Sequence, residues 1–238
     1  MVRSTYFRPA ALMSALLAAV LSASGLAAQA PVPKLEEGVD ASLAYHLARE
    51  ARARDELERA AALLELAVDL DPAAVLPRLD RVEVLLELNR PRAAASILAP
   101  IAARVEAETA ARPATAARYH RLIGAVALRS GQPHQAIEGY ERASRLAPWD
   151  LRIRAQLIGL HRATGDPAGA IPHLRAATEA LPENAELRVE LGDALLDLER
   201  YTEAEAAYLD ALELTPRSSE LHRRLERKID RARSAIRR

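Results

Sequence analysis

The sequence predicts an all-α fold built of repeated helix pairs, and three observations support this prediction. The chain is rich in alanine, leucine, arginine and glutamate, which are strong helix formers, and half of its residues are hydrophobic although only 3% are aromatic. Proline recurs at a fixed step of 34 residues, at Pro148, Pro182 and Pro216. Leucines recur three and four residues apart between positions 187 and 198, which is the spacing of one helix face.

The proline period divides most of the chain into five repeats, each expected to hold two helices. Alanines keep the same step, and we expect them where helices cross closely, because a larger side chain would overpack the contact at a cost of about 1–3 kcal/mol. The register breaks once, at an eight-residue insertion. The five repeats are 41–74, 75–108, 117–150, 151–184 and 185–218, the insertion is 109–116, and the recurring alanines include Ala136, Ala143, Ala170, Ala177, Ala204 and Ala211.

The turns inside the repeats have their own signature. In the third and fourth repeats the segments 130–133 and 164–167 carry glycine followed by proline two residues later. Glycine is expected to end the first helix and proline to begin the second. In the second repeat Pro100 falls inside the second helix, where it removes a backbone hydrogen bond and kinks the helix. Residues 41–108 are therefore expected to form a less regular half, hinged to the rest around 100–116.

This register resembles the tetratricopeptide repeat (TPR), which has small residues at its eighth and twentieth positions, a large one at the twenty-fourth, alanine at the twenty-seventh and proline at the thirty-second. The fifth repeat matches best, with Gly192, Ala204, Tyr208, Ala211 and Pro216. The resemblance implies a right-handed superhelical α-solenoid of about five helix-turn-helix units. The family's tryptophan near the start of each first helix is missing, and its places are taken by Ala44, Arg78, His120, Arg154 and Arg188.

Residues 219–238 predict one more helix. Leu221, Leu225, Ile229 and Ile236 fall on one face, and arginines occupy the other. A terminal repeat needs a cap to cover its last apolar face, so we expect a capping helix with a solvated basic side. The alternative is that the basic side contacts an anionic membrane surface or an acidic patch of a partner.

Residues 1–30 resemble a secretory signal peptide. Arg3 and Arg8 precede an apolar stretch from Ala10 to Leu21, and small residues around Ala27–Ala30 suit cleavage. Residues 31–40 then form a linker. The mature chain is expected in the periplasm or outside the cell, the alternative being an uncleaved N-terminal membrane anchor. Cleavage would leave 33 − 2 = 31 basic against 33 acidic residues, so no positive field favours nucleic acid as a partner.

The sequence contains no signature of catalysis. The absence of cysteine excludes disulfides, thiol catalysis and cysteine metal sites. Six histidines are scattered without the four-residue spacing of a helical zinc site, and neither a glycine-rich phosphate loop nor a nucleophile elbow occurs. We therefore expect no enzyme activity, no cofactor and no metal. His120 and His161 are expected at packing positions, and Trp149 is expected to fill the turn between two repeats.

The resemblance also implies a binding face, because the first helices of such repeats line a concave groove. The positions that point into the groove form a basic centre between two acidic rims. In the first repeat, the same positions hold Tyr45, His46, Arg49 and Arg52. Arginine binds carboxylates in a fork, so we expect an acidic peptide or a free C-terminus there, with the rims rejecting other registers. The alternative is that these charges only solvate the face and pair with each other. The basic centre comprises Arg118, Arg121, Arg129, Arg152, Gln156 and Arg162, and the rims comprise Asp80, Glu83, Glu87, Glu186, Glu190, Asp193 and Asp197.

Together these features predict an exported scaffold for protein–protein interaction, serving cell-envelope assembly. Two alternatives stay open: a membrane-surface adaptor acting through the basic C-terminal helix, and a non-catalytic subunit of an enzyme or secretion complex.

Overall fold

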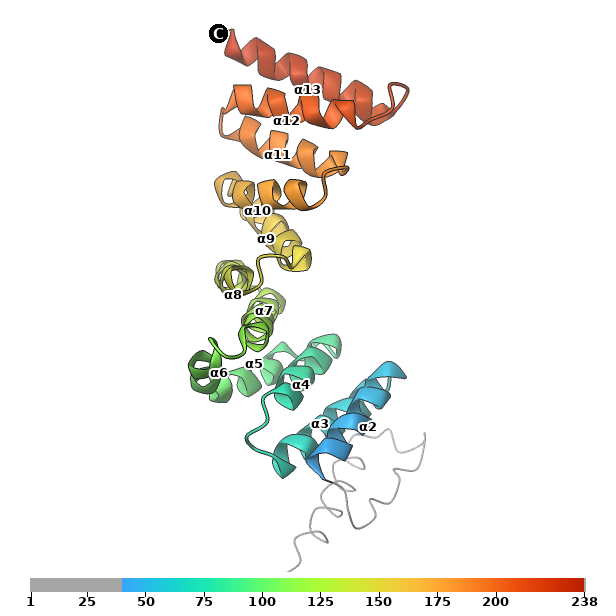
Figure 1. Cartoon of the computed structure of the whole chain (residues 1–238), viewed down its shortest axis with the longest axis vertical. Helices are drawn as coiled ribbons and strands as arrows, with labels where there is room; N and C mark the ends of the chain where they lie inside the picture. The colour runs from blue at the N-terminus through green and yellow to red at the C-terminus, as the bar shows by residue number, and fades with distance from the viewer. Residues whose placement is uncertain (1–39, 238) are drawn as a thin grey trace, which may run out of the picture. The chain divides into compact units, whose positions relative to one another are not determined.

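The computed structural model describes residues 40–237, and within this range every regular element is helical (Figure 1). The all-α prediction is confirmed for the described chain, whereas the predicted signal peptide and nearly all of the linker lie outside it. The chain divides into two compact blocks, which we treat separately: an N-terminal block up to Ile97 and a C-terminal block from Leu98.

The N-terminal block contains α2 (Ala41–Ala53), α3 (Leu57–Leu70), α4 (Leu76–Glu87) and α5 (Pro91–Leu98), the last of which ends at the block boundary. Helices α2 and α3 pack around Ala48, Ala60 and Leu64, which are almost fully buried. The two alanines let the helices approach closely, and the leucine fills the contact between them.

The C-terminal block begins with short segments, followed by three helix pairs and a single last helix. Each helix from α7 onward contacts the next one along the chain, so the repeats stack in sequence order. The elements are η1 (Ala99–Ile101), α6 (Ala102–Glu108), α7 (Pro113–Arg129), α8 (Pro133–Leu146), α9 (Leu151–Ala163), α10 (Pro167–Ala180), α11 (Ala185–Asp197), α12 (Tyr201–Glu213) and α13 (Glu220–Ile236).

The second helix of the second repeat is broken, as Pro100 predicts. Three short elements, α5, η1 and α6, stand where other repeats have one helix, and Pro100 lies in the 3₁₀ turn between the two α-helical pieces. Proline has no amide hydrogen to donate, so the α-helical ladder stops there. Helix α7 begins at Pro113, so half of the 109–116 segment extends the first helix of the third repeat.

The corners between paired helices repeat the same backbone conformation in all five repeats. The fifteenth residue of each repeat has positive φ: 61° at Asp55, 57° at Asn89, 73° at Gly131, 69° at Gly165 and 58° at Glu199. The amide of the following residue bonds back to a carbonyl of the first helix over 2.7 to 2.9 Å in each case. This is the Schellman closure of a helix end, and it confirms the predicted glycine stops at Gly131 and Gly165.

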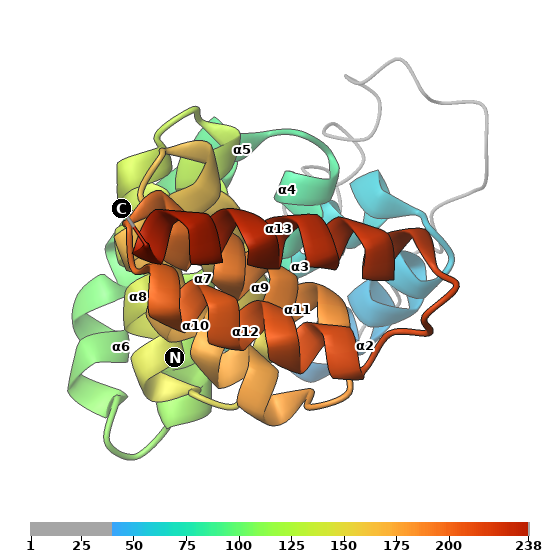
Figure 2. The same cartoon turned by 90° about the horizontal axis from the view of Figure 1, so that it is seen from above.

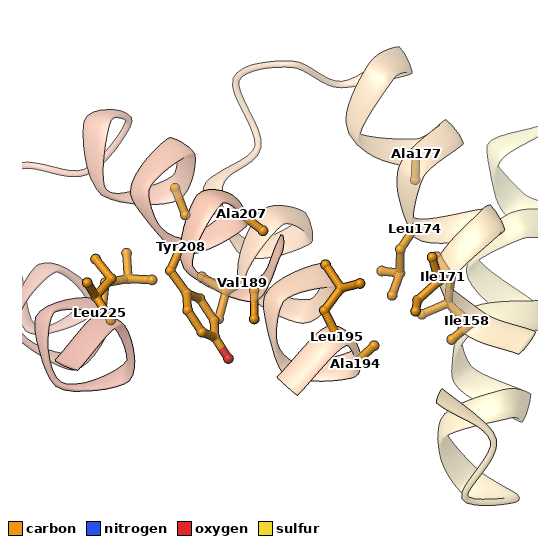
Figure 3. Close-up of a cluster of buried hydrophobic side chains, with 14 residues drawn as sticks. Ile158, Ile171, Leu174, Ala177, Val189, Ala194, Leu195, Ala207, Tyr208 and Leu225 are labelled. Atoms are coloured by element: carbon orange, nitrogen blue, oxygen red, sulfur yellow. The ribbon is translucent and has the colours of Figure 1, made fainter. Parts of the chain in front are cut away.

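The core of the C-terminal block lies between successive layers (Figure 3). Leu174, Leu195, Tyr208 and Leu225 are at most 2% exposed and come from α10, α11, α12 and α13. All six alanines predicted at close helix crossings are at most 5% exposed. The 34-residue period therefore locates the interlayer contacts correctly.

Helix α13 lies across α12 at the end of the C-terminal block (Figures 1 and 2). Leu225, Ile229 and Ala232 are buried against the preceding layer, which is the arrangement expected of a terminal cap. Ile236, predicted on the same apolar face, is instead 45% exposed in the last turn. Within residues 40–237, no helix is long and apolar enough to cross a membrane.

Candidate binding surface

The six residues of the predicted basic centre lie on two helices of the C-terminal block. Helix α7 carries three of them and helix α9 the other three. Each of these helices is the first of its repeat. The α7 residues are Arg118, Arg121 and Arg129, of which the last is exposed and the others half-buried, and the α9 residues are Arg152, Gln156 and Arg162, all exposed.

On α7, two arginines share one face. Arg121 and Arg129 are eight residues apart, with Ala125 midway, so they lie on one row of the helix. Tyr140 of α8 lies behind this row: burial raises the pKa of its phenol, and the positive charges of Arg121 and Arg129 partly offset that rise. Both guanidinium groups therefore lie close enough to this phenol to act on it.

Helix α9 has a row of small residues between its polar ones, so little side chain covers its backbone there. Ala155, Gly159 and Ala163 follow each other at four-residue steps, and both alanines are exposed. A Cβ atom added at Gly159 would meet no heavy atom within 4 Å. Arg152 and Arg162 lie near the two ends of the same helix. An extended peptide backbone can therefore approach α9 closely while its polar groups meet arginine at either end.

Some of these charges pair within the chain, as the alternative interpretation predicted. Arg152 makes two charged hydrogen bonds to Asp150, of 3.1 Å from Nε and 3.0 Å from a terminal nitrogen, although its side chain is 88% exposed. Arg162 lies 3.8 Å from Glu190 of α11. The hydrogen bonds from Arg152 lower the pKa of Asp150, which keeps this carboxylate ionised.

The acidic rims are less uniform than the sequence predicted. Asp80 is only 8% exposed. Glu83 and Glu87 both accept hydrogen bonds from Arg52, at 2.9 and 2.5 Å. In the C-terminal block, Asp193 accepts the hydroxyl hydrogen of Tyr208 and also contacts Lys228 of α13. These acids mainly hold neighbouring helices together, whereas Glu186 and Asp197 are exposed.

The prediction that Trp149 fills the turn between repeats is wrong, because its side chain is 76% exposed. Arg154 closes the turn instead, donating to the carbonyl oxygen of Pro148 over 3.0 Å from Nε. The indole lines a shallow hollow together with Asp150, Leu151 and Arg152. A large exposed aromatic ring beside an arginine is the composition of an interaction hot spot.

One cluster escaped the sequence analysis. Glu141 of α8, His161 of α9 and His173 of α10 place their side-chain ligand atoms within 4.8 Å of one another. The prediction that His161 occupies a packing position is confirmed, since it is 5% exposed, and His120 is 4% exposed. The three members of the cluster come from three helices, so no spacing within one helix could indicate them.

Comparison with known proteins agrees with this architecture. Residues 158–219 match the family model described as tetratricopeptide repeat. No curated protein matches the sequence. The fold of the described residues is an α-solenoid of helix-turn-helix repeats, and the matched segment lies within its C-terminal block.

Solved structures extend the fold assignment beyond the matched segment. MamA is 17% identical with a TM-score of 0.58, and the match covers 73% of this chain and 91% of that one. YrrB, described as a TPR protein with an unusual peptide-binding site, is 22% identical with a TM-score of 0.57 over 79% and 92% of the two chains. Pseudomonas aeruginosa pilF is 18% identical with a TM-score of 0.54 over 82% and 86%. At these identities the likeness establishes the fold.

Proposed function

We propose that this chain is an exported, non-catalytic scaffold that binds a protein or peptide on the exposed faces of α7 and α9. The observation that carries the proposal is the row Ala155, Gly159 and Ala163, which leaves space above α9 between Arg152 and Arg162. Structural likeness to YrrB, whose description names a peptide-binding site, supports this use of the fold.

The ligand we propose is an acidic segment or a free C-terminus. Arg152 already holds a carboxylate, that of Asp150, through two nitrogens, and its exposed side chain can exchange this partner for a ligand carboxylate. Arg121 and Arg129 add two further arginines on α7. Trp149 supplies an apolar contact next to Arg152. Charge and one aromatic anchor together suit a short peptide.

A crosslinked pull-down from envelope extract tests this surface. The tagged full chain would be compared with Arg121→Glu/Arg152→Glu and with Gly159→Phe, which fills the space above α9 without changing charge. Arg142→Glu/Arg175→Glu is the matched control, because it makes the same charge change on exposed residues of the second helices α8 and α10. We expect the first two variants to lose the partner and the control to keep it. A partner retained by both test variants would move the binding site elsewhere.

Peptide arrays test the chemistry of the ligand. A charge-assisted, two-nitrogen contact contributes about 1.5–3 kcal/mol, so amidating a recognised C-terminus should weaken binding about tenfold or more. Equal binding of amidated and free peptides would exclude the C-terminal carboxylate as the recognised group. An acidic internal segment would then be tested by replacing its side-chain carboxylates with amides.

Export rests on the signal-like features of residues 1–30, which lie outside the described residues. The N-terminus of the mature chain, determined by mass spectrometry, is expected to follow a cleavage near Ala27–Ala30. An intact N-terminus in the membrane fraction would support an anchor instead. A role in cell-envelope assembly follows from compartment and fold together, and partner identification tests it.

A second candidate is a membrane-surface adaptor acting through the basic helix α13, and another is a non-catalytic subunit of an enzyme or secretion complex. The observation in favour is the set of exposed arginines Arg223, Arg224, Arg227 and Arg231 on one helix. Against it, Arg233 and Lys228 are engaged with Glu205 and Asp193 of neighbouring helices. Sedimentation with anionic liposomes should detect binding that is lost when the four arginines become glutamine.

A further inference from the structure

Two buried histidines and one partly exposed glutamate meet where α8, α9 and α10 pack together. His173 Nε2 lies 2.9 Å from Glu141 Oε1, and His161 Nε2 lies 3.9 Å from the same oxygen. The imidazole rings are nearly parallel, with an interplanar angle of 17° and centroids 5.9 Å apart. Both rings thus direct a nitrogen at one carboxylate oxygen. The other oxygen of Glu141 lies 3.8 Å from Arg145.

The partner of His161 fixes which of its nitrogens carries the proton. Nδ1 lies 3.0 Å from the carboxylate of Asp166, and an ionised carboxylate only accepts hydrogen bonds. The same carboxylate also accepts a hydrogen bond from the backbone amide of Gly169, at 3.0 Å. In the neutral ring the proton therefore sits on Nδ1, and Nε2 presents its lone pair towards Glu141.

His161 Nε2 is then a buried acceptor facing another acceptor. The residue is 5% exposed, and Nε2 has no hydrogen-bond partner among the described residues. Leaving a buried polar atom unpaired is costly, and a lone pair aimed at a carboxylate oxygen adds repulsion. A cation between the two atoms would satisfy both of them.

Gly169 makes this arrangement sterically possible. A Cβ atom at this position would collide with the imidazole of His161, at Cε1 and Nδ1, and with the carboxylate of Asp166. The glycine therefore leaves room for the His161–Asp166 pair against the first turn of α10. The imidazole of His161 can take this position only because residue 169 has no side chain.

We propose that Glu141, His161 and His173 bind one divalent transition-metal ion of the Zn²⁺ type, with Asp166 orienting His161. Two imidazoles and a carboxylate are a common three-ligand set for Zn²⁺, and a metal-bound histidine typically donates its second N–H to a carboxylate. Tetrahedral bonds of about 2.0–2.1 Å place neighbouring ligand atoms roughly 3.3 Å apart. The two separations from Glu141, 2.9 and 3.9 Å, bracket this value, and all three ligand atoms lie within 4.8 Å of one another, so side-chain adjustments that draw the two histidines together complete the site.

The site has an access path and an open position. The side chain of Glu141 is 34% exposed, whereas those of both histidines are 7% exposed, so an ion would enter past the glutamate. Three protein ligands leave a fourth position for water or for a side chain of a binding partner. Because the ligands come from three consecutive helices, the bound ion would link the third and fourth repeats and stabilise their packing.

Cobalt and zinc titrations of the tag-free full chain, freed of metal with a chelator, test the proposal. Tetrahedral Co²⁺ gives visible absorption bands, which we expect to saturate at one equivalent and to disappear when Zn²⁺ displaces it. Glu141→Gln, His161→Ala and His173→Ala should each weaken binding at least tenfold. Asp166→Asn and Gly169→Ala should weaken it by roughly ten- to a hundredfold, through the position of His161.

His120→Ala is the matched control. His120 is equally buried and lies 3.4 Å from Glu106, yet it belongs to no three-ligand group among residues 40–237. We expect this variant to bind Co²⁺ like the unmodified chain. Because Glu141 is partly exposed, Glu141→Gln should keep its helical circular dichroism. It should lose the Zn²⁺-dependent rise in melting temperature that we expect of the unmodified chain.

Two results would overturn the proposal. One is the absence of any Co²⁺ spectrum or Zn²⁺ stabilisation in the unmodified chain. The other is unchanged affinity in Glu141→Gln and both alanine variants, which would show that the metal binds elsewhere. Neither result bears on the peptide-binding surface, which lies on different residues of α7 and α9.

Discussion

The ring of Tyr208 lies against the backbone of Gly192, and its hydroxyl donates to the carboxylate of Asp193 at 2.6 Å. One side chain of α12 thus contacts two consecutive residues of α11. The third repeat has the same glycine–tyrosine contact, because a Cβ at Gly124 would lie 2.8 Å from the ring of Tyr140. The equivalent positions of the fourth repeat hold Ile158 and Leu174, which are both buried in one cluster. A larger residue on the first helix is therefore matched by a smaller one on the second.

This size exchange predicts strong coupling between positions 192 and 208. Gly192→Ile alone should overpack the interlayer contact and lower the free energy of unfolding by about 1–3 kcal/mol or more. Adding Tyr208→Leu, which reproduces the pair of the fourth repeat, should restore part of the loss. Urea denaturation of the two single variants and the double variant measures the coupling. Additive changes would show that the two positions do not share one packing volume.

Replacing glycine by alanine should change the free energy of unfolding in opposite directions at two positions on the first helices of repeats. Gly159→Ala should raise the free energy of unfolding by about 0.5–1 kcal/mol, because alanine favours helix and its Cβ meets open space. Gly192→Ala should lower it, because that Cβ collides with the ring of Tyr208. Thermal unfolding of the two variants gives the comparison. A stabilising Gly192→Ala would contradict the close contact described above.

Replacing the corner residue Glu199 by glycine should increase the stability of the fold. Its φ of 58° is costly for a side chain with a Cβ, so Glu199→Gly should stabilise the chain by about 1 kcal/mol. Gly165→Ala, at the same corner of the preceding repeat, is the reverse test and should destabilise by a similar amount. Chemical denaturation monitored by circular dichroism would detect both changes, and equal signs for the two variants would contradict the shared corner geometry.

Stability should fall at alkaline pH in a way that depends on Tyr208. Burial, followed by the hydrogen bond to Asp193, raises the pKa of this phenol well above its ordinary value. Above pH of about 10 an unfolded tyrosine loses its proton while the folded one keeps it, so high pH favours unfolding. Tyr208→Phe should make the loss of stability at high pH smaller. Part of the loss should remain, because burial also raises the pKa values of Tyr119 and Tyr140. The partly exposed Tyr201 gives the control Tyr201→Phe.

His120 should contribute to sensitivity at mildly acidic pH. Burial lowers its pKa, with Arg142 and Arg145 acting in the same direction and Glu106, 3.4 Å away, opposing them. The unfolded residue takes up a proton near pH 6.5 while the folded one stays neutral, so stability is lost as the pH falls below this value. His120→Gln should reduce the difference in melting temperature between pH 7 and pH 5.5. His134→Gln, at an exposed site, should leave it unchanged.

Much of the fold could be predicted because it depends on local periodicity. The alanine positions follow from the 34-residue step, and Gly131, Gly165 and Pro100 act on the backbone of their own helices, whatever surrounds them. The predicted arginines could be placed on α7 and α9 for the same reason. Their pairing with Asp150 and Glu190 depends on side-chain rotamers, which no sequence period determines.

The remaining features depend on contacts between helices. Trp149 was expected to be buried, but Arg154 and the backbone close that turn. Asp80 is buried although its position suggested an exposed rim. Glu141, His161 and His173 lie on three helices, and only the stacking of the third and fourth repeats brings them together. Such sites follow from the packing between layers rather than from a motif along the chain.

Trp149 gives the molecule an internal optical reporter, because it is the chain's single tryptophan. Its indole is already 76% exposed in the folded state, so unfolding should change its emission little. A ligand seated beside Arg152 would cover the indole and shift or quench that emission. Fluorescence can therefore register occupancy of α9 without an added dye, while circular dichroism follows the helices independently.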